Sequence, residues 1–330
     1  MTNLVKSNNR FLELFNETKF ISDQGPLAQK IYLQFLTAEI RNKNTRQTYA
    51  TAIMKFSKWL DKLKWETNTK CGLGNVQPFM VAAYIEHLQK ENSLPTVKQN
   101  LSAINKLFNY MVVNQVISYN PAAPVKSPKY SQKVGKAPVL NKKEARMLLD
   151  SIDTNTLKGK RDKALIALMI YSFSRVSAAI NMKIKDFHRQ GVRYFFRLHE
   201  KGGKMHSVPA HHEARELVYD YLSSAGIMEE KDQPMFRSLS HPKHSDSLGT
   251  SAMTRQAVFL MVKRRSKDAG ISEETCCHSF RATGITTFLL GGGDLETAAR
   301  IANHELTSTT KLYDRRNKSL TEEEIERIRL

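Results

Sequence analysis

Four residues in the last fifth of the chain have types and spacing that suit phosphodiester chemistry. His278 and Arg281 are three positions apart, His304 follows an apolar segment, and Tyr313 lies nine residues after His304. A phenol has a reference pKa of about 10, so a tyrosine attacks phosphorus only when a base accepts its proton and cations stabilise the developing charge. The two histidines and the guanidinium can supply both functions. Taken singly, each histidine is more often a structural hydrogen-bonded residue, and Tyr313 could belong to a core.

A further arginine, Arg175, follows a segment that must be deeply buried. Residues 164–171 are apolar on every side, which predicts a helix buried all round. Burying a lone guanidinium costs several kcal/mol, so we expect Arg175 to have an anionic partner. Either a nearby carboxylate or a bound phosphate would serve as that partner.

Two lysines lie in the turn of a predicted β-hairpin. Residues 191–198 alternate and are rich in aromatics, and residues 205–209 form a second extended run, so both predict strands. Lys201-Gly-Gly-Lys204 would be the turn between them. A lysine in such a turn is usually just solvated.

Taken in order, these residues resemble the motifs of the tyrosine recombinases of the Xer and phage-integrase type. His278-Ser-Phe-Arg281 resembles the HxxR box, Asn303-His304 the (G)H box, and Tyr313 the tyrosine box. Arg175 lies in a stretch similar to the family's first arginine box, commonly Gly-Leu-Arg-Val-Ser-Glu. The chain departs from that box at Ser174 and at Ala178, where the family has an acidic residue that supports the active-site geometry. That departure puts the full catalytic rate in doubt.

The resemblance implies a mechanism and a catalytic set. Two arginines would bind the non-bridging oxygens, His278 would accept the tyrosine proton, His304 would add a hydrogen bond, and Tyr313 would form a 3′-phosphotyrosine. A hairpin lysine would protonate the leaving 5′-oxygen, and Lys201 is favoured over Lys204 from its position. The implied catalytic residues are Arg175, Lys201, His278, Arg281, His304 and Tyr313.

We expect the chain to need no cofactor. Re-ligation from a phosphotyrosine ester requires neither ATP nor a divalent metal, and the sequence has no GxxxxGK[S/T] loop. His211-His212 and His241-Pro-Lys-His244 lack a matching cysteine or carboxylate cluster, so no zinc site is predicted. Cys276 and Cys277 beside His278 could suggest a thiol nucleophile, but adjacent cysteines are more often packing residues.

The charge balance favours a polyanionic partner. The chain has 330 residues and 51 Lys and Arg against 32 Asp and Glu, a formal net charge of +19. Nucleic acid is the usual partner of such a surface, although a solvated basic surface with no specific role is the alternative. The three cysteines have no framework spacing, and neither a membrane span nor a signal peptide is predicted, so we expect a cytoplasmic, nucleoid-associated protein.

The expected fold is mainly α with a small β-sheet. It comprises an N-terminal helical core-binding (SAM-like) domain and a C-terminal α+β tyrosine-recombinase catalytic domain. Helices are predicted over residues 27–40, 45–63, 78–90 and from the N-cap Ser93 to Met111. The helix over 45–63 has the apolar stripe Tyr49, Ile53, Phe56 and Leu60, and later helices start at the cap Asn141 and at His211. The expected divisions are an arm or extra helix (1–40), core-binding domain (41–120), basic Pro-containing linker (121–138), catalytic domain (139–316) and C-terminal helix (317–330).

Several basic and polar residues are candidates for DNA contact, with solubility as the alternative explanation. A helix in residues 251–269 resembles the family helix that enters the major groove. The candidates are Arg46, Lys98, Lys106, Lys204, Thr254, Arg255, Gln256 and Lys263. The resemblance implies double-stranded DNA with paired inverted half-sites and a homo-oligomer, a tetramer on DNA, in which the C-terminal helix docks on a neighbouring protomer or on its own domain.

Two other functions fit parts of the pattern. A non-catalytic, sequence-specific DNA-binding protein on the same fold would explain Ala178, but the intact catalytic set speaks against it. A type IB topoisomerase would use similar chemistry without a specific site, but the core-binding helices and modest length speak against it. Salt-dependent DNA binding would not separate the three, because all contact phosphates.

Overall fold

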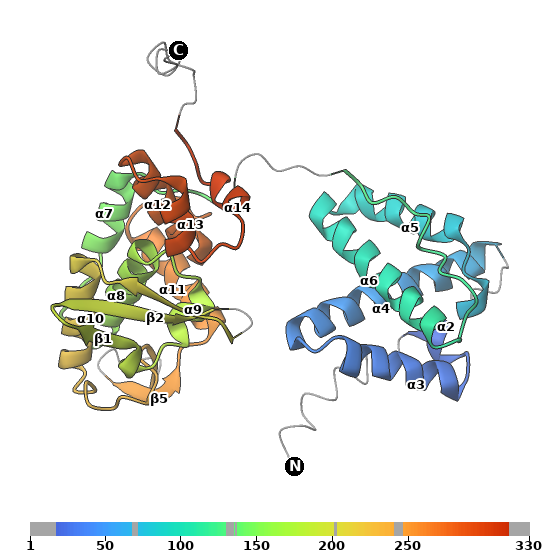
Figure 1. The fold of residues 1–330 in the computed structure, drawn as a ribbon, viewed down its shortest axis with the longest axis horizontal. Helices are drawn as coiled ribbons and strands as arrows, with labels where there is room; N and C mark the ends of the chain where they lie inside the picture. The colour runs from blue at the N-terminus through green and yellow to red at the C-terminus, as the bar shows by residue number, and fades with distance from the viewer. Residues whose placement is uncertain are drawn as a thin grey trace, which may run out of the picture. The chain divides into compact units, whose positions relative to one another are not determined.

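A computed structural model describes residues 18–67, 72–129, 135, 137–200, 203–240 and 247–316, with residues 64–67 as backbone only. The chain forms two compact units, Met1–Ser131 and Gln132–Leu330, each with its own core. Figure 1 shows the helical N-terminal unit and the mixed C-terminal unit. Among the described residues no helix is long and apolar enough to cross a bilayer.

The N-terminal unit is entirely helical in its described part. The four helices predicted here are present, and the first begins as α-helix and ends as a short π-helix. The elements are α2 (Lys19–Ser22), α3 (Pro26–Gln34), the π-helix η1 (Phe35–Glu39), α4 (Lys43–Thr67), the 3₁₀ turn η2 (Leu73–Asn75), α5 (Pro78–Glu91) and α6 (Leu94–Val113).

Amphipathic spacing explains these helices. Ile53, Phe56 and Leu60 recur at helical intervals on α4 and are fully buried, as their stripe predicts. Proline occupies the first turn of α3, α5 and α6, where its missing N–H costs nothing. Ser93 is the N-cap of α6 as predicted, but its hydroxyl lies 3.0 Å from Thr96 Oγ1 and accepts no backbone hydrogen bond.

An aromatic cluster forms the centre of this unit. The Phe20 ring packs edge-on to Phe56 at 5.7 Å between centroids, and Phe56 lies 5.0 Å from Tyr84 and 6.3 Å from Phe108. Because Phe20 belongs to α2, the described part of the expected arm is integrated into the core of the N-terminal unit.

The chain leaves this unit through a fixed turn at Asn120. Its side-chain amide donates to the Oδ1 atoms of Asn105 and Asn109 at 2.6 Å each, which ties the turn to α6. Ala122, placed at the start of the expected linker, is 1% exposed and belongs to the N-terminal core. At the other end of that segment, the Gly135 N–H donates to the Leu312 carbonyl oxygen within the C-terminal unit.

The C-terminal unit combines helices with two small antiparallel sheets. Its elements are α7 (Lys142–Asp150), α8 (Leu157–Tyr171), α9 (Val176–Ile180), η3 (Ile184–Asp186), β1 (Phe187–Gln190), β2 (Arg193–His199), β3 (Met205–Pro209), α10 (His212–Ser224), β4 (Arg237–Leu239), β5 (Leu248–Ala252), α11 (Arg255–Asp268), α12 (Cys277–Leu290), α13 (Leu295–Ile301) and α14 (Thr307–Lys311). The mainly α architecture with a small sheet confirms the expected fold class.

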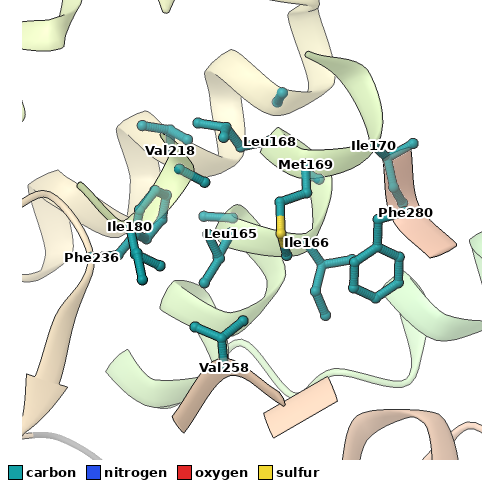
Figure 2. Close-up of a cluster of buried hydrophobic side chains, with 14 of the residues drawn as sticks. Leu165, Ile166, Leu168, Met169, Ile170, Ile180, Val218, Phe236, Val258 and Phe280 are labelled. Carbon is teal, nitrogen blue, oxygen red and sulfur yellow. The ribbon is translucent and has the colours of Figure 1, made fainter. Parts of the chain in front are cut away.

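Helix α8 is the centre of the C-terminal core. Figure 2 shows Leu165, Leu168 and Met169 of α8 among side chains from the surrounding elements. Every residue from Ala164 to Met169 is fully buried, so the prediction of a helix buried all round is correct. The labelled partners are Ile180, Val218, Phe236, Val258 and Phe280.

The three-stranded sheet has the order β1-β2-β3. The predicted hairpin is present as β2 and β3, whose register pairs Phe196 with Val208 and His199 with Met205. Sequence patterning missed β1, because its four residues are too few to show an alternation.

A buried carboxylate fixes α11 against α8. Asp162 is fully buried and accepts hydrogen bonds from Arg161, Arg264 and Arg265 at 2.8–3.2 Å. A buried carboxylate needs several charged donors to offset its desolvation. Part of the basic stretch 263–265, on the helix expected to enter the major groove, therefore serves the packing of α11.

Candidate active site

Helix α12 places His278 and Arg281 one turn apart. Its N-terminus is held by a reciprocal contact in which the Cys276 N–H donates to Ser279 Oγ at 3.1 Å. Gly284 lets this helix approach α8, because a Cβ there would lie 2.0 Å from the Ile170 carbonyl oxygen. Close packing of α12 against the buried helix α8 thus fixes the positions of His278 and Arg281.

Arg281 is a fully buried guanidinium with a dense set of acceptors. Its Nη2 donates to the Ala302 carbonyl oxygen and to His304 Nε2, both at 2.6 Å, and its Nη1 donates to the Phe173 carbonyl oxygen. The Nε donor has no hydrogen-bond partner among the described residues. Burial, and next the charge of Arg175, lower the pKa of Arg281 to about 10, so it stays charged at neutral pH.

Two residues with positive φ shape the loops that face Arg281. Phe173 has φ 52° and Asn303, directly before His304, has φ 48°. The left-handed region costs an ordinary residue about 1–2 kcal/mol, and asparagine tolerates it best after glycine. This explains why asparagine can stand at the first position of the (G)H box.

His304 is a neutral hydrogen-bond acceptor. Burial, followed by the charges of Arg281 and Arg175, lowers its pKa to about 3. Since Nε2 accepts from Arg281, the ring proton lies on Nδ1, which donates to Thr310 Oγ1 at 2.8 Å. In this state His304 orients Arg281, whereas a hydrogen bond donated by Nε2 would require the proton on that nitrogen.

Tyr313 belongs both to the candidate site and to a small buried apolar cluster. Its hydroxyl is 2.7 Å from His278 Nε2, and its carbonyl oxygen accepts a hydrogen bond from Thr286 Oγ1 at 2.9 Å. The side chain is 6% exposed and packs with Phe173, Ile285 and neighbouring apolar residues. Tyr313 is therefore held at its hydroxyl and at its backbone.

The protonation states suit a proton transfer from Tyr313 to His278. Burial, then the charges of Arg281 and Arg175, lower the pKa of His278, so its ring is neutral at pH 7 and can accept a proton. Burial raises the pKa of Tyr313, and the two arginines oppose that rise. The phenol consequently holds its proton until a base takes it.

Arg175 has the carboxylate partner that was one of the two expectations. Its Nη1 donates to Glu200 Oε2 at 2.6 Å, and the Arg175 side chain is 41% exposed while that of Glu200 is 4% exposed. The exposed arginine retains other N–H donors that could reach a ligand.

The two hairpin lysines have different outcomes. Lys201 lies outside the described residues. Lys204 is described, and its Nζ lies 2.5 Å from Glu305 Oε1 in an exposed ion pair. That pair connects the hairpin to the loop after His304.

The candidate DNA contacts of the N-terminal unit are partly engaged within the protein. Arg46 Nε donates to the Ile40 carbonyl oxygen at 3.1 Å, and Lys106 Nζ lies 2.9 Å from Glu39 Oε1. Lys98 is exposed on α6. Arg46 Nη2 also donates to the Thr37 carbonyl oxygen at 3.4 Å, so two of its guanidinium nitrogens hold the segment between η1 and α4.

The candidates on α11 cluster at its N-terminus. Thr254 is the N-cap and accepts from the Ala257 N–H at 3.1 Å, while Arg255 and Gln256 are exposed in the first turn. Lys263 donates to the Glu273 carbonyl oxygen and lies over the Phe259 ring at 5.4 Å. Arg255 and Gln256 therefore have the more accessible side chains.

One histidine pair lies beside a carboxylate that the sequence did not associate with it. Ligand atoms of His211, His212 and Glu213 lie within 4.8 Å of one another. The Glu213 carboxylate is already engaged by Arg146 at 3.1 and 3.2 Å, and His211 Nδ1 accepts from the Glu213 N–H. These bonds compete with metal binding, and His241 and His244 lie outside the described residues.

The thiol next to the site is not an activated nucleophile. Burial raises the pKa of Cys277 to about 11. A thiol that stays protonated at neutral pH is a poor nucleophile, which argues against Cys277 in that role.

Comparison with known proteins identifies the architecture. Residues 138–319 match the model described as "Phage integrase family", and residues 30–115 match "Phage integrase, N-terminal SAM-like domain". The chain belongs to the phage integrase family. Both expected domains, and the expectation of a tyrosine recombinase, are thereby confirmed.

Individual relatives agree with this family assignment. "Tyrosine recombinase XerD" of Listeria innocua is 26% identical over 286 residues, covering 86% of this chain and 91% of its own. "Tyrosine recombinase XerC" of Thermodesulfovibrio yellowstonii is 28% identical over 240 residues, 72% of this chain and 77% of its own. The expected enzyme class, DNA strand breakage and rejoining, is that of this family.

Solved structures share the fold. XerH site-specific recombinase bound to difH substrate superposes with a TM-score of 0.63 at 24% identity, covering 86% of this chain and 78% of that one. A lambda integrase tetramer bound to a Holliday junction gives 0.64 at 15% identity, covering 88% and 78%.

Three residues that support the site of this phage-integrase family member were not predicted from the sequence. Thr286 and Thr310 hold Tyr313 and His304, and Glu200 pairs with Arg175. The two threonines carried no signal, because their roles depend on contacts between α12, α14 and the tyrosine segment. Glu200 could have been noticed as the acid directly before Lys201.

Proposed function

We propose that this recombinase cleaves and rejoins duplex DNA at specific sites through a 3′-phosphotyrosine intermediate with Tyr313 as nucleophile. The observation that carries the proposal is the 2.7 Å contact between the Tyr313 hydroxyl and His278 Nε2, beside two charged guanidiniums. A nucleophile hydrogen-bonded to its base, with cations nearby, is the arrangement that such a displacement needs.

In the cleavage step, the Tyr313 oxygen forms a bond to phosphorus and its proton passes to His278. The bond between phosphorus and the 5′-oxygen breaks, and Lys201 supplies the proton to that oxygen. Arg175 and Arg281 bind the non-bridging oxygens, since planar guanidiniums match them well. Attack of a 5′-hydroxyl on the phosphotyrosine reverses every step and rejoins the strand.

The reaction needs neither ATP nor a divalent metal. The ester to Tyr313 conserves the energy of the phosphodiester, and the charge that a metal would neutralise is met by Arg175, Arg281 and Lys201. We therefore expect full cleavage activity in the presence of a metal chelator.

The substrate is double-stranded DNA with paired inverted half-sites, held by a tetramer of the enzyme. The enzyme works in the cytoplasm in association with the nucleoid, and its substrates include mobile elements. The formal charge of +19 supports a polyanionic partner. The solved lambda integrase tetramer on a Holliday junction supports a four-subunit assembly for this fold. Arg255 and Gln256, exposed at the start of α11, are suited to read base edges.

Covalent trapping on nicked duplexes from the flanking genomic sequence tests the proposal. The protein is incubated in EDTA, denatured in detergent and examined for protein-linked DNA. We expect an adduct with wild type and with Tyr219→Phe, which alters an exposed tyrosine, and none with Tyr313→Phe. Specific binding without any adduct would instead indicate a DNA-binding protein, and relaxation of supercoiled DNA without a preferred site would indicate a topoisomerase.

A further inference from the structure

Glu200 is a buried acid within the active site. It directly follows β2, and its backbone N–H donates to the Lys204 carbonyl oxygen at 2.8 Å, which closes the base of the hairpin. Its side chain is only 4% exposed. A buried carboxylate is costly unless it is paired, and within the described residues its ion-pair partner is Arg175.

Arg175 depends on this carboxylate for its orientation. The arginine is the N-cap residue of α9, and its side chain extends into a partly exposed region. Among the described residues, Glu200 accepts the one hydrogen bond that the Arg175 side chain donates, from Nη1 at 2.6 Å. An arginine side chain carries about 2 kcal/mol of rotamer entropy, so an unpaired Arg175 would sample several positions before phosphate arrives.

The carboxylate also offsets repulsion between the two arginines. The Arg175 charge lowers the pKa of Arg281, whereas the Glu200 charge raises it. One negative charge near both guanidiniums therefore makes it easier to keep them charged and close together while the site is empty. The bond to Glu200 uses one N–H of Arg175, and a guanidinium has five.

No acid is available from the start of α9. Ala178, where the resembling family has an acidic residue, is 1% exposed and packs in the apolar core around α8. Glu200 lies 25 residues downstream of Arg175, directly after β2, and contacts it from the hairpin.

We propose that Glu200 is a positioning residue that holds Arg175 in the orientation that binds the scissile phosphate, and that it stands in for the acid missing at Ala178. This inference rests on the proposed function, because the consequence of the contact is a faster attack by Tyr313. It also links Arg175 to the hairpin that carries Lys201.

Single-turnover cleavage of a nicked site by the full-length chain tests the role of Glu200. We expect Glu200→Ala to lower the cleavage rate about 10- to 100-fold, in line with the cost of a misplaced catalytic group. Glu200→Gln keeps an acceptor oxygen for Arg175 and should lose less. DNA affinity should stay within about twofold, since phosphate contacts over the whole site dominate binding.

A double-mutant cycle separates positioning from a structural effect. If Glu200 acts through Arg175, Glu200→Ala causes no further loss of rate in an Arg175→Ala background. The matched control is Glu213→Ala, which removes another arginine–carboxylate pair of the same unit, Arg146–Glu213 at 3.1 Å, and should cleave at the wild-type rate.

Three outcomes would overturn the inference while wild type still forms its adduct. The first is a wild-type cleavage rate in Glu200→Ala. The others are an equally large loss of rate from Glu200→Ala in the Arg175→Ala background, or a loss of rate in Glu213→Ala as large as that in Glu200→Ala. If Glu200→Ala does not fold, the same comparison with Glu200→Gln decides. Absence of an adduct with wild-type protein would instead refute the proposed function itself.

Discussion

Replacing Arg281 with lysine should damage both stability and cleavage. Arg281 is 1% exposed and donates to two carbonyl oxygens, those of Phe173 and Ala302, and to the His304 ring. A single ammonium cannot reach all three acceptors. Hydrogen bonds to a charged group contribute about 1.5–3 kcal/mol each, so losing two should destabilise the C-terminal unit by roughly 3–6 kcal/mol. Cleavage should fall about 100-fold or more.

The two tryptophans provide an internal control for this measurement. Both Trp59 and Trp65 lie on α4 of the N-terminal unit. In urea unfolding, tryptophan fluorescence therefore reports that unit, whereas far-UV circular dichroism reports both. We expect Arg281→Lys to shift the circular dichroism transition to lower urea and to leave the fluorescence midpoint in place. Wild-type values for both the circular dichroism transition and cleavage would refute the reasoning.

Three further changes test the surroundings of the site. Thr310→Val removes the acceptor for His304 Nδ1 and should slow cleavage about 10-fold, whereas Thr309→Val, at an exposed position, should not. Because the folded pKa of His304 is about 3, below its ordinary 6.5, its contribution to stability is full above pH 6.5 and is lost as pH falls toward 3. Between pH 7 and 5, wild type should lose about 1–2 kcal/mol more than His304→Gln in urea unfolding; an equal loss would contradict the assignment. Gly284→Ala places Cβ 2.0 Å from a backbone oxygen and should destabilise the C-terminal unit by about 1–3 kcal/mol, unlike Gly249→Ala, whose nearest neighbour would be 3.4 Å away; equal midpoints would exclude the clash.

The helices and the hairpin were readable from the sequence because their signals are local. The stripe of Ile53, Phe56 and Leu60 and the fully apolar run in α8 each fix a helix and its burial without knowledge of the partner. Asn141 is an equally local signal, and it forms the predicted cap with Glu144.

The parts that could not be read depend on contacts between distant segments. Asp162 accepts hydrogen bonds from Arg264 and Arg265 of α11, which lie more than a hundred residues away in sequence. Their local sequence therefore indicates an exposed basic surface and not a buried ion pair. The role of His304 likewise depends on which nitrogen meets Arg281. A motif identifies the residue, but the hydrogen bond decides whether it donates or accepts.

The linkage of the covalent adduct tests the central claim most directly. A nicked duplex carrying a label on either side of the cleaved bond is trapped, digested with protease and analysed by mass spectrometry. We expect one nucleotide-linked peptide, joined at Tyr313 to a 3′-phosphate, formed in the presence of EDTA. An adduct on another residue, a linkage to a 5′-phosphate, or an undiminished adduct with Tyr313→Phe would contradict the account.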